Sequence, residues 1–135
     1  MGLEAIGEGI ATRLATISGL QVFAPNALPD SINQFPAALI LPGETEYDAS
    51  FSGDADYRFR IIIVVTKQDS PSALNRLLDY IELTGTYSVK AAIEADRSLN
   101  SSADDCHLRR NLGIGTTLWG GYIYLSTEFV LEVWK

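Results

Sequence analysis

Apolar residues recur at spacings of three and four in three parts of the chain, and each part is predicted to be a helix. In residues 3–17 these positions form one apolar face, and Gly19 is placed to end the helix. A second helix is expected over residues 70–85, because a Ser-Pro pair is a favourable helix start. Its predicted buried stripe consists of Leu74, Leu77, Leu78 and Ile81. A third, shorter helix is expected over residues 88–95, capped by its first serine.

Alternating or wholly apolar stretches predict strands at 21–24, 37–41, 44–51, 57–66, 106–119 and 122–134. Pro42-Gly43 is expected to close the second of these strands. The third and fourth are expected to form a hairpin in which carboxylates lie near arginines across the strands. The expected neighbours are Glu46 and Asp48 on one strand and Arg58 and Arg60 on the other. Gly120-Gly121 predicts the turn of a long final hairpin.

The faces of the final hairpin follow from the same alternation. One face of its first strand is expected to carry Cys106, Leu108, Arg110, Leu112 and Ile114. The buried face of its second strand is expected to carry Ile123, Leu125, Phe129, Leu131 and Val133.

The predicted order of elements is αβββ–αα–ββ when the short first strand at 21–24 is left open, with the helices grouped rather than alternating with the strands. This grouping predicts an α+β fold with a mixed, mostly antiparallel sheet and helices packed on one of its faces. The chain has 135 residues, the size of one ordinary domain, and no repeat or long linker divides it. We therefore expect a single domain over residues 1–135.

The chain is acidic, with 17 acidic and 10 basic residues and a formal net charge of −7. Sequence-reading DNA binding is not expected, because neutralising phosphates requires a cationic surface. Arg109-Arg110 remains a small local basic patch. The longest apolar run, at residues 61–65, is too short to span a bilayer, and no signal peptide is recognised, so no membrane association is expected.

The residues that usually carry chemistry are few. The single cysteine, Cys106, and the single histidine, His107, are adjacent, so a strand places their side chains on opposite faces and out of hydrogen-bond reach. One Cys and one His cannot form a structural zinc site, and the acidic run at 96–105 lacks the spacing of a calcium loop. Phosphate-binding, dinucleotide-binding and serine-hydrolase motifs are also missing. We expect no enzymatic activity, cofactor or metal.

Two segments are candidate contact surfaces. The hairpin of residues 44–60 has an acidic tip at 52–56, and aromatic side chains along its stem. It is either an ordinary hairpin packed on the core or an arm that reaches a neighbouring molecule. The Pro- and Asn-rich loop at 25–36 is the second candidate, since long ordered loops often carry function.

Aromatic residues near the end of the chain allow a different interpretation, a small ligand-binding module with an aromatic pocket. The residues in question are Trp119, Tyr122, Tyr124 and Trp134. Packing of aromatic side chains across neighbouring strands accounts for the same pattern.

The order of several segments resembles that of the tail-terminator (tail-completion) proteins of long-tailed bacteriophages. The segments are the amphipathic helix, the strand with its flanking prolines at 36–42, the acidic hairpin, the strand at 57–65, the stretch 85–96 with Leu99, and the final hairpin ending at 128–134. The most characteristic of them is the stretch 85–96, which reads GTYSVKAAIEAD. The resemblance covers most of the chain.

The resemblance implies a structural virion protein that acts as a ring at the head-proximal end of the tail. Such a ring, a hexamer in the family, caps the tail tube, ends its polymerisation and forms the joint to the head connector. The implied partners are further copies of the chain, the tail tube protein and the head–tail connector or stopper protein, and assembly takes place in the host cytoplasm. DNA would pass through the ring without specific binding, which an acidic lumen suits because it repels phosphate.

The resemblance also suggests roles for particular residues. Candidates for an arm that contacts a neighbouring subunit or the tube are Tyr47, Phe51, Tyr57, Arg58 and Arg60. Candidates for the acidic lining of the lumen are Asp48, Asp54, Asp56, Asp104 and Asp105. The alternative functions are a head–tail connector or minor capsid component, or a small non-enzymatic ligand-binding module.

Overall fold

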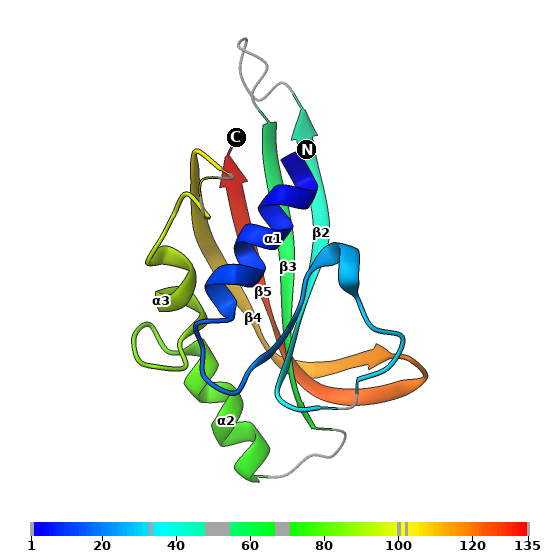
Figure 1. Ribbon diagram of the computed structural model, residues 1–135. Helices are drawn as coiled ribbons and strands as arrows, with labels where there is room; N and C mark the ends of the chain where they lie inside the picture. Colours follow the sequence, from blue (N-terminus) through cyan, green and yellow to red (C-terminus); the bar gives the residue numbers. More distant parts are fainter. Residues whose placement is uncertain are drawn as a thin grey trace.

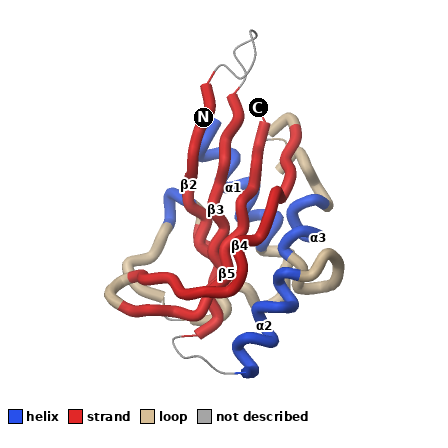
Figure 2. Tube along the Cα trace, turned by 180° about the vertical axis from the view of Figure 1, so that it is seen from behind, coloured by secondary structure: helices blue, strands red, loops and turns tan. Residues whose placement is uncertain are grey.

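The computed structural model shows three helices packed on one face of a five-stranded sheet (Figures 1 and 2). The structure describes residues 2–32, 34–47, 55–66, 71–99, 101 and 103–134. Seen from behind, the strands lie in front of all three helices (Figure 2). We call the side of the sheet that carries the helices the helix face and the other side the opposite face. The predicted α+β class, with helices on one face of a mixed sheet, is confirmed.

The elements follow one another in the predicted order. They are α1 (Gly2–Leu14), β1 (Gln21–Phe23), the short 3-10 helix η1 (Pro25–Ala27), β2 (Ala37–Tyr47), β3 (Ala55–Thr66), α2 (Pro71–Ile81), α3 (Val89–Glu94), β4 (Asp105–Trp119) and β5 (Tyr122–Trp134). One expectation was wrong, because Pro42-Gly43 does not close a strand. The stretches 37–41 and 44–47 form the single strand β2, whose pairing with β3 shifts register between Pro42 and Thr45. Such an irregularity accommodates a proline, which cannot donate to the ladder.

The strands are arranged in the order β1-β2-β3-β5-β4. β1 runs parallel to β2, and the other neighbours are antiparallel. The last strand of the chain, β5, therefore lies inside the sheet between β3 and β4. Strand β4 forms one edge of the sheet, at the left in Figure 1.

The main core lies between the helices and the helix face. From α1 and the turn after it, the predicted positions are buried: Ile6, Ile10, Leu14 and Ile17. Val89 and Ile93 of α3 are also fully buried, and the Ser88 hydroxyl accepts a hydrogen bond from the Ala91 amide at 3.1 Å, which confirms the predicted cap. The sheet contributes Phe59, Ile61, Ile63, Cys106, Leu108, Phe129, Leu131 and Val133.

Four apolar helical positions differ from the prediction. Leu3 of α1 is exposed, as it lies in the first turn, outside the core. In α2, Leu77 is buried and is joined by Tyr80, whereas Leu74 and Leu78 are exposed and Ile81 is only partly buried. The side of the helix that carries Leu77 and Tyr80 packs against the sheet. The predicted apolar stripe of α2 therefore lies at the edge of the surface that contacts the sheet, not at its centre.

A second, smaller core lies on the opposite face. It contains Ile32, Ala37, Leu39, Ile62, Val64 and Tyr124. The far end of the β4–β5 hairpin bends towards the segment before β2 (Figure 1), and the Trp119 indole donates a hydrogen bond to the Pro29 carbonyl at 2.9 Å. The Phe35 and Tyr124 rings lie 5.6 Å apart. Trp119 and Tyr124 are therefore core residues, as the packing interpretation of the aromatic pattern expected.

The predicted alternation of β4 holds only near its start. Cys106 and Leu108 are buried, but Leu112 and Ile114 are exposed. The pairing with β5 shifts register between Leu108 and Arg110 and again between Asn111 and Ile114. Because each bulge inserts a residue, it changes the face on which the following side chains lie.

Gly120 and Gly121 form the turn of the β4–β5 hairpin, with φ values of 59° and 86°. Positive φ at both central residues is the requirement of the type I′ turn, which explains the predicted Gly-Gly pair. Gly120 has a second constraint, because a Cβ atom there would lie 2.5 Å from the Asp30 carbonyl oxygen. A Cβ atom at Gly121 would meet nothing within 4 Å.

We therefore expect Gly120→Ala to lower the free energy of unfolding by about 2–3 kcal/mol, the sum of backbone strain and a backbone clash. The matched variant Gly121→Ala should lower it by only about 1 kcal/mol, because it adds strain without the clash. Urea unfolding of both variants measures the difference. Equal losses would show that the approach of the turn to Asp30 does not contribute.

Candidate functional site

The predicted interface arm is only partly described. Tyr47 ends β2 and pairs in register with Ala55 at the start of β3. Phe51, together with Asp48 and Asp54, lies outside the described residues. Tyr57 is half-buried and packs against the main core, so its ring supports the base of the hairpin rather than projecting from it.

Three of the predicted acidic residues meet at one end of the sheet. Asp56 and Asp105 both lie level with Trp134 of β5, one on each side of it. The Asp104 amide donates to the Trp134 carbonyl at 2.9 Å, which places Asp104 at the same end. Their exposure differs: Asp104 is exposed, Asp105 is half-exposed and pairs with Arg97 at 2.9 Å, and Asp56 is only 8% exposed. Burial of Asp56 does not fit the expected place in the lining of a channel.

A chain of ion pairs crosses four strands on the opposite face. Arg58 of β3 lies between Glu44 of β2, at 3.4 Å, and Glu132 of β5, at 3.6 Å. Glu132 also accepts a hydrogen bond of 2.9 Å from Arg109 of β4. The Glu132 side chain is only 6% exposed, whereas that of Glu44 is 76% exposed. Glu132 is therefore the central, desolvated member of this chain of charges.

Arg60 has its own partner on β5. Its guanidinium donates to both carboxylate oxygens of Glu128, at 2.8 and 3.0 Å, and this hydrogen bonding raises the pKa of Arg60. The expectation that Glu46 and Asp48 lie near Arg58 and Arg60 across the first hairpin stays a prediction, because Asp48 and the side chain of Glu46 are outside the described part of the chain. The arginines are held within the subunit by strand β5, so their charges are already compensated.

A hollow of about 290 Å³ lies along β4, beside the ends of α2 and α3. We call it the β4 groove. Its apolar floor is formed by Ile81, Leu83, Leu108 and Phe129. Its polar rim is formed by Lys90, His107, Arg109, Arg110 and Asn111, and no carboxylate is among the lining residues described. The groove is thus a basic, partly apolar surface on an acidic protein.

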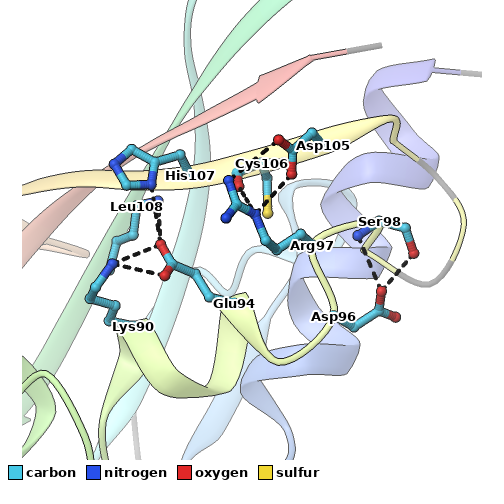
Figure 3. A network of polar contacts seen from close by, with 9 residues as sticks. All are labelled: Lys90, Glu94, Asp96, Arg97, Ser98, Asp105, Cys106, His107 and Leu108. Carbon is cyan, nitrogen blue, oxygen red and sulfur yellow. Dashed lines mark hydrogen bonds and ion pairs between the residues drawn. The ribbon is translucent and has the colours of Figure 1, made fainter.

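A polar network fastens α3 to β4 beside this groove (Figure 3). Glu94 accepts two hydrogen bonds from Lys90, at 2.8 and 2.9 Å, and one from the Leu108 amide at 3.3 Å, and its carboxylate lies 3.3 Å from His107 Nδ1. Burial acts to raise the pKa of Glu94, but the hydrogen bonds and the positive charge of Lys90 outweigh it and lower the pKa. Lys90 and Arg109 are therefore paired within the subunit.

Arg110 differs from the other basic residues of the rim. It is exposed, and it makes no ion pair with any residue in the described ranges. The sequence shows Arg109-Arg110 as a basic patch, but nothing in it indicates the apolar floor beside them. That floor is assembled from α2, the segment after it, β4 and β5, which are far apart in sequence.

Cys106 and His107 do not form a catalytic pair. Cys106 is fully buried in the main core, and burial, with a contribution from the charge of Asp105, raises the pKa of its thiol to about 11. The His107 ring instead lies beside Glu94 (Figure 3). Within the described residues, no three His, Cys, Asp or Glu side chains are grouped so that they could hold a metal ion. No helix in the same residues is long and apolar enough to cross a membrane.

The Glu132→Gln variant should lose about 2 kcal/mol of unfolding free energy, because it leaves Arg58 and Arg109 without their shared, desolvated carboxylate. Glu44→Gln, at the exposed end of the same chain of charges, should change stability by about 0.5 kcal/mol or less. Chemical denaturation at neutral pH compares the two. A similar small effect of both variants would mean that Glu132 is not the centre of the interaction.

The Cys106 thiol should react with a disulfide reagent at pH 8 about 100-fold more slowly in the native protein than in urea, because burial disfavours the reactive thiolate. His107→Ala should leave the native rate unchanged, since His107 has another partner. The rate is followed by the absorbance of the released thiol. Slower labelling of the His107→Ala variant would contradict this arrangement and indicate an activating Cys–His pair.

Comparison of the sequence with protein-family models and with curated proteins finds no match. The function is therefore inferred from the geometry of the described residues and from the order of the sequence segments.

Proposed function

We propose that this protein is a structural, non-enzymatic subunit of a tail-terminator-like ring at the head-proximal end of a bacteriophage tail. The observation that carries the proposal is the long edge strand of the sheet, β4, whose start is fastened to α3. β4 has 15 residues and is the last strand in the sheet order of the described residues, next to a groove whose rim includes the exposed Arg110. A subunit with two different contact surfaces can associate head to tail, which is the condition for a ring.

The charge distribution supports the same role. The formal net charge is −7, and Asp104 and Asp105 lie at the same end of the sheet as the base of the arm. If that end faces the lumen, phosphate groups are repelled rather than bound, and DNA passes without being held. The four arginines near the opposite face and the groove do not contradict this, because three of them are paired with glutamates.

A head–tail connector or minor capsid component would use the same kinds of subunit contact at a different place in the virion. The two functions therefore differ in where the protein lies in the virion and in what happens when the protein is removed. They do not differ in the surfaces needed for contacts between subunits. The ligand-binding alternative receives less support, because Trp119 and Tyr124 are packed in the second core.

Tails assembled without the protein should have irregular lengths and should fail to join heads, because nothing ends growth of the tube. Electron microscopy measures the length distribution and the fraction of joined particles, with tails complemented by the wild-type protein as the control. Labelled protein should lie at the head-proximal end of the tail. Tails of normal length that still join heads would overturn the proposal, and label confined to the capsid would favour the connector or capsid alternative.

A further inference from the structure

The outer edge of β4, the last strand in the sheet order of the described residues, is covered near its start. The Cys106 carbonyl accepts a hydrogen bond from Arg97 Nε at 3.1 Å, and the Leu108 amide donates to Glu94 at 3.3 Å (Figure 3). Side chains from α3 and the segment after it thus occupy backbone groups of this edge. Contacts of this kind prevent an edge strand from pairing with another chain.

The edge differs near the end of β4, where the turn decides which backbone groups point outward. In a hairpin closed by two residues, the flanking pair, here Trp119 and Tyr122, exchanges both of its backbone hydrogen bonds. Every second residue of β4 then bonds to β5, and the N–H and C=O groups of Ile114, Thr116 and Leu118 point to the outer side. No described residue outside the sheet forms a hydrogen bond with these groups.

The stretch 114–118 also lacks the side chains that usually protect an edge. Residues 111–127 contain no charged residue and no proline, although the protein carries a net charge of −7. Leu118 and Ile123, which lie level with each other, are 70% and 61% exposed, and Ile114 is 40% exposed. Exposed apolar side chains beside outward-pointing backbone groups favour the addition of a further strand.

A second copy of the same stretch is complementary to it. When two copies run antiparallel with Thr116 opposite Thr116, Ile114 of each copy lies opposite Leu118 of the other, and the outward backbone groups of all three residues are paired. Apolar side chains then meet across the contact, and threonine faces threonine, both of which are favourable cross-strand pairs. The overlap covers residues 112–120, which carry no charge, so two acidic copies meet there without opposed carboxylates. It ends before the part of the edge that is fastened to α3.

We propose that the stretch 114–118 of β4 pairs with the same stretch of a second copy of this chain and joins the two sheets into one. The contact is isologous, because both copies use the same residues, and it closes with two copies. It goes beyond the proposed function and does not depend on it, because a head-to-tail contact through β4 would replace this pairing in a ring.

Disulfide cross-linking in the full chain tests both the contact and its register. Thr116→Cys places two thiols opposite each other, with Cα atoms about 5.5 Å apart, which is within the range of a disulfide. Leu118→Cys is the control, because its thiol lies about 13 Å along the strands from the same thiol of the other copy. The native Cys106 is fully buried and stays in every variant.

Under mild oxidation, the Thr116→Cys protein should form covalent dimers about tenfold faster than the Leu118→Cys protein, because only its thiols meet. A mixture of the Ile114→Cys and Leu118→Cys proteins should form mixed dimers as fast as Thr116→Cys forms its own, which a general loss of folding cannot explain. Equal rates for Thr116→Cys and Leu118→Cys, or no mixed dimers, would overturn the contact.

A lysine on the edge provides a second test. Adding Leu118→Lys to the Thr116→Cys protein should slow cross-linking about tenfold, since a charged side chain opposes pairing at an edge. Leu83→Lys is the matched control, because Leu83 is also 70% exposed and lies outside β4, and it should leave the rate unchanged. Both variants make the net charge less negative, so slower cross-linking cannot come from stronger repulsion. An equal effect of the two lysines would contradict the proposal.

The outcome is independent of the test of tail function. If Thr116→Cys forms the cross-link but tails lacking the protein have normal length, the two-fold contact stands and the tail function fails. If tail length depends on the protein but the cross-link does not form, the tail function stands and the two-fold contact fails.

Discussion

The insertion of β5 between β3 and β4 is the constraint on which the rest of the structure depends. On the helix face, β5 supplies Phe129, Leu131 and Val133 to the main core. On the opposite face it supplies Glu128 and Glu132, which pair with arginines on both neighbouring strands. One strand thus contributes both to the main core on the helix face and to the ion pairs on the opposite face. Neither can form fully until the end of the chain is in place. Pairing of this kind, between residues far apart in sequence, usually makes folding slow.

The elements themselves could be predicted because their signals are local. The Ser88 cap, the Gly120-Gly121 turn and the apolar face of α1 each depend on residues within a few positions of one another. The partners of the strands have no such signal. The expected partners of Arg58 and Arg60 are carboxylates of the strand that precedes them in sequence, and Arg58 does pair with Glu44 of that strand. Glu132 and Glu128, which pair with Arg58 and Arg60 from β5, are about 70 residues away in sequence. The bulges of β4 could not be predicted from local sequence either, because each depends on how two strands pair.

The candidate site also combines features that local sequence indicates with features that depend on the tertiary structure. The acidic residues at 104–105 and the basic pair at 109–110 are visible as composition, and both lie on the surface of the structure. Their environment is not visible in this way. Asp56 is acidic in sequence and buried in the fold. Arg109 is paired, whereas its neighbour Arg110 makes no ion pair with any residue that the structure describes. Burial and pairing are properties of the tertiary structure, so residue type alone cannot distinguish a charge that is free to bind from one already in use.

If the protein forms the proposed ring, its uneven distribution of charge would orient neighbouring copies. Two copies with a net charge of −7 repel each other unless a basic surface of one meets an acidic surface of the other. In the proposed ring each copy would offer two different surfaces to its two neighbours, so one contact would leave a second surface free on each copy. Addition of further copies can continue until the rotation between neighbours closes the assembly. The number of copies in such a ring would be set by the angle between those two surfaces within one subunit.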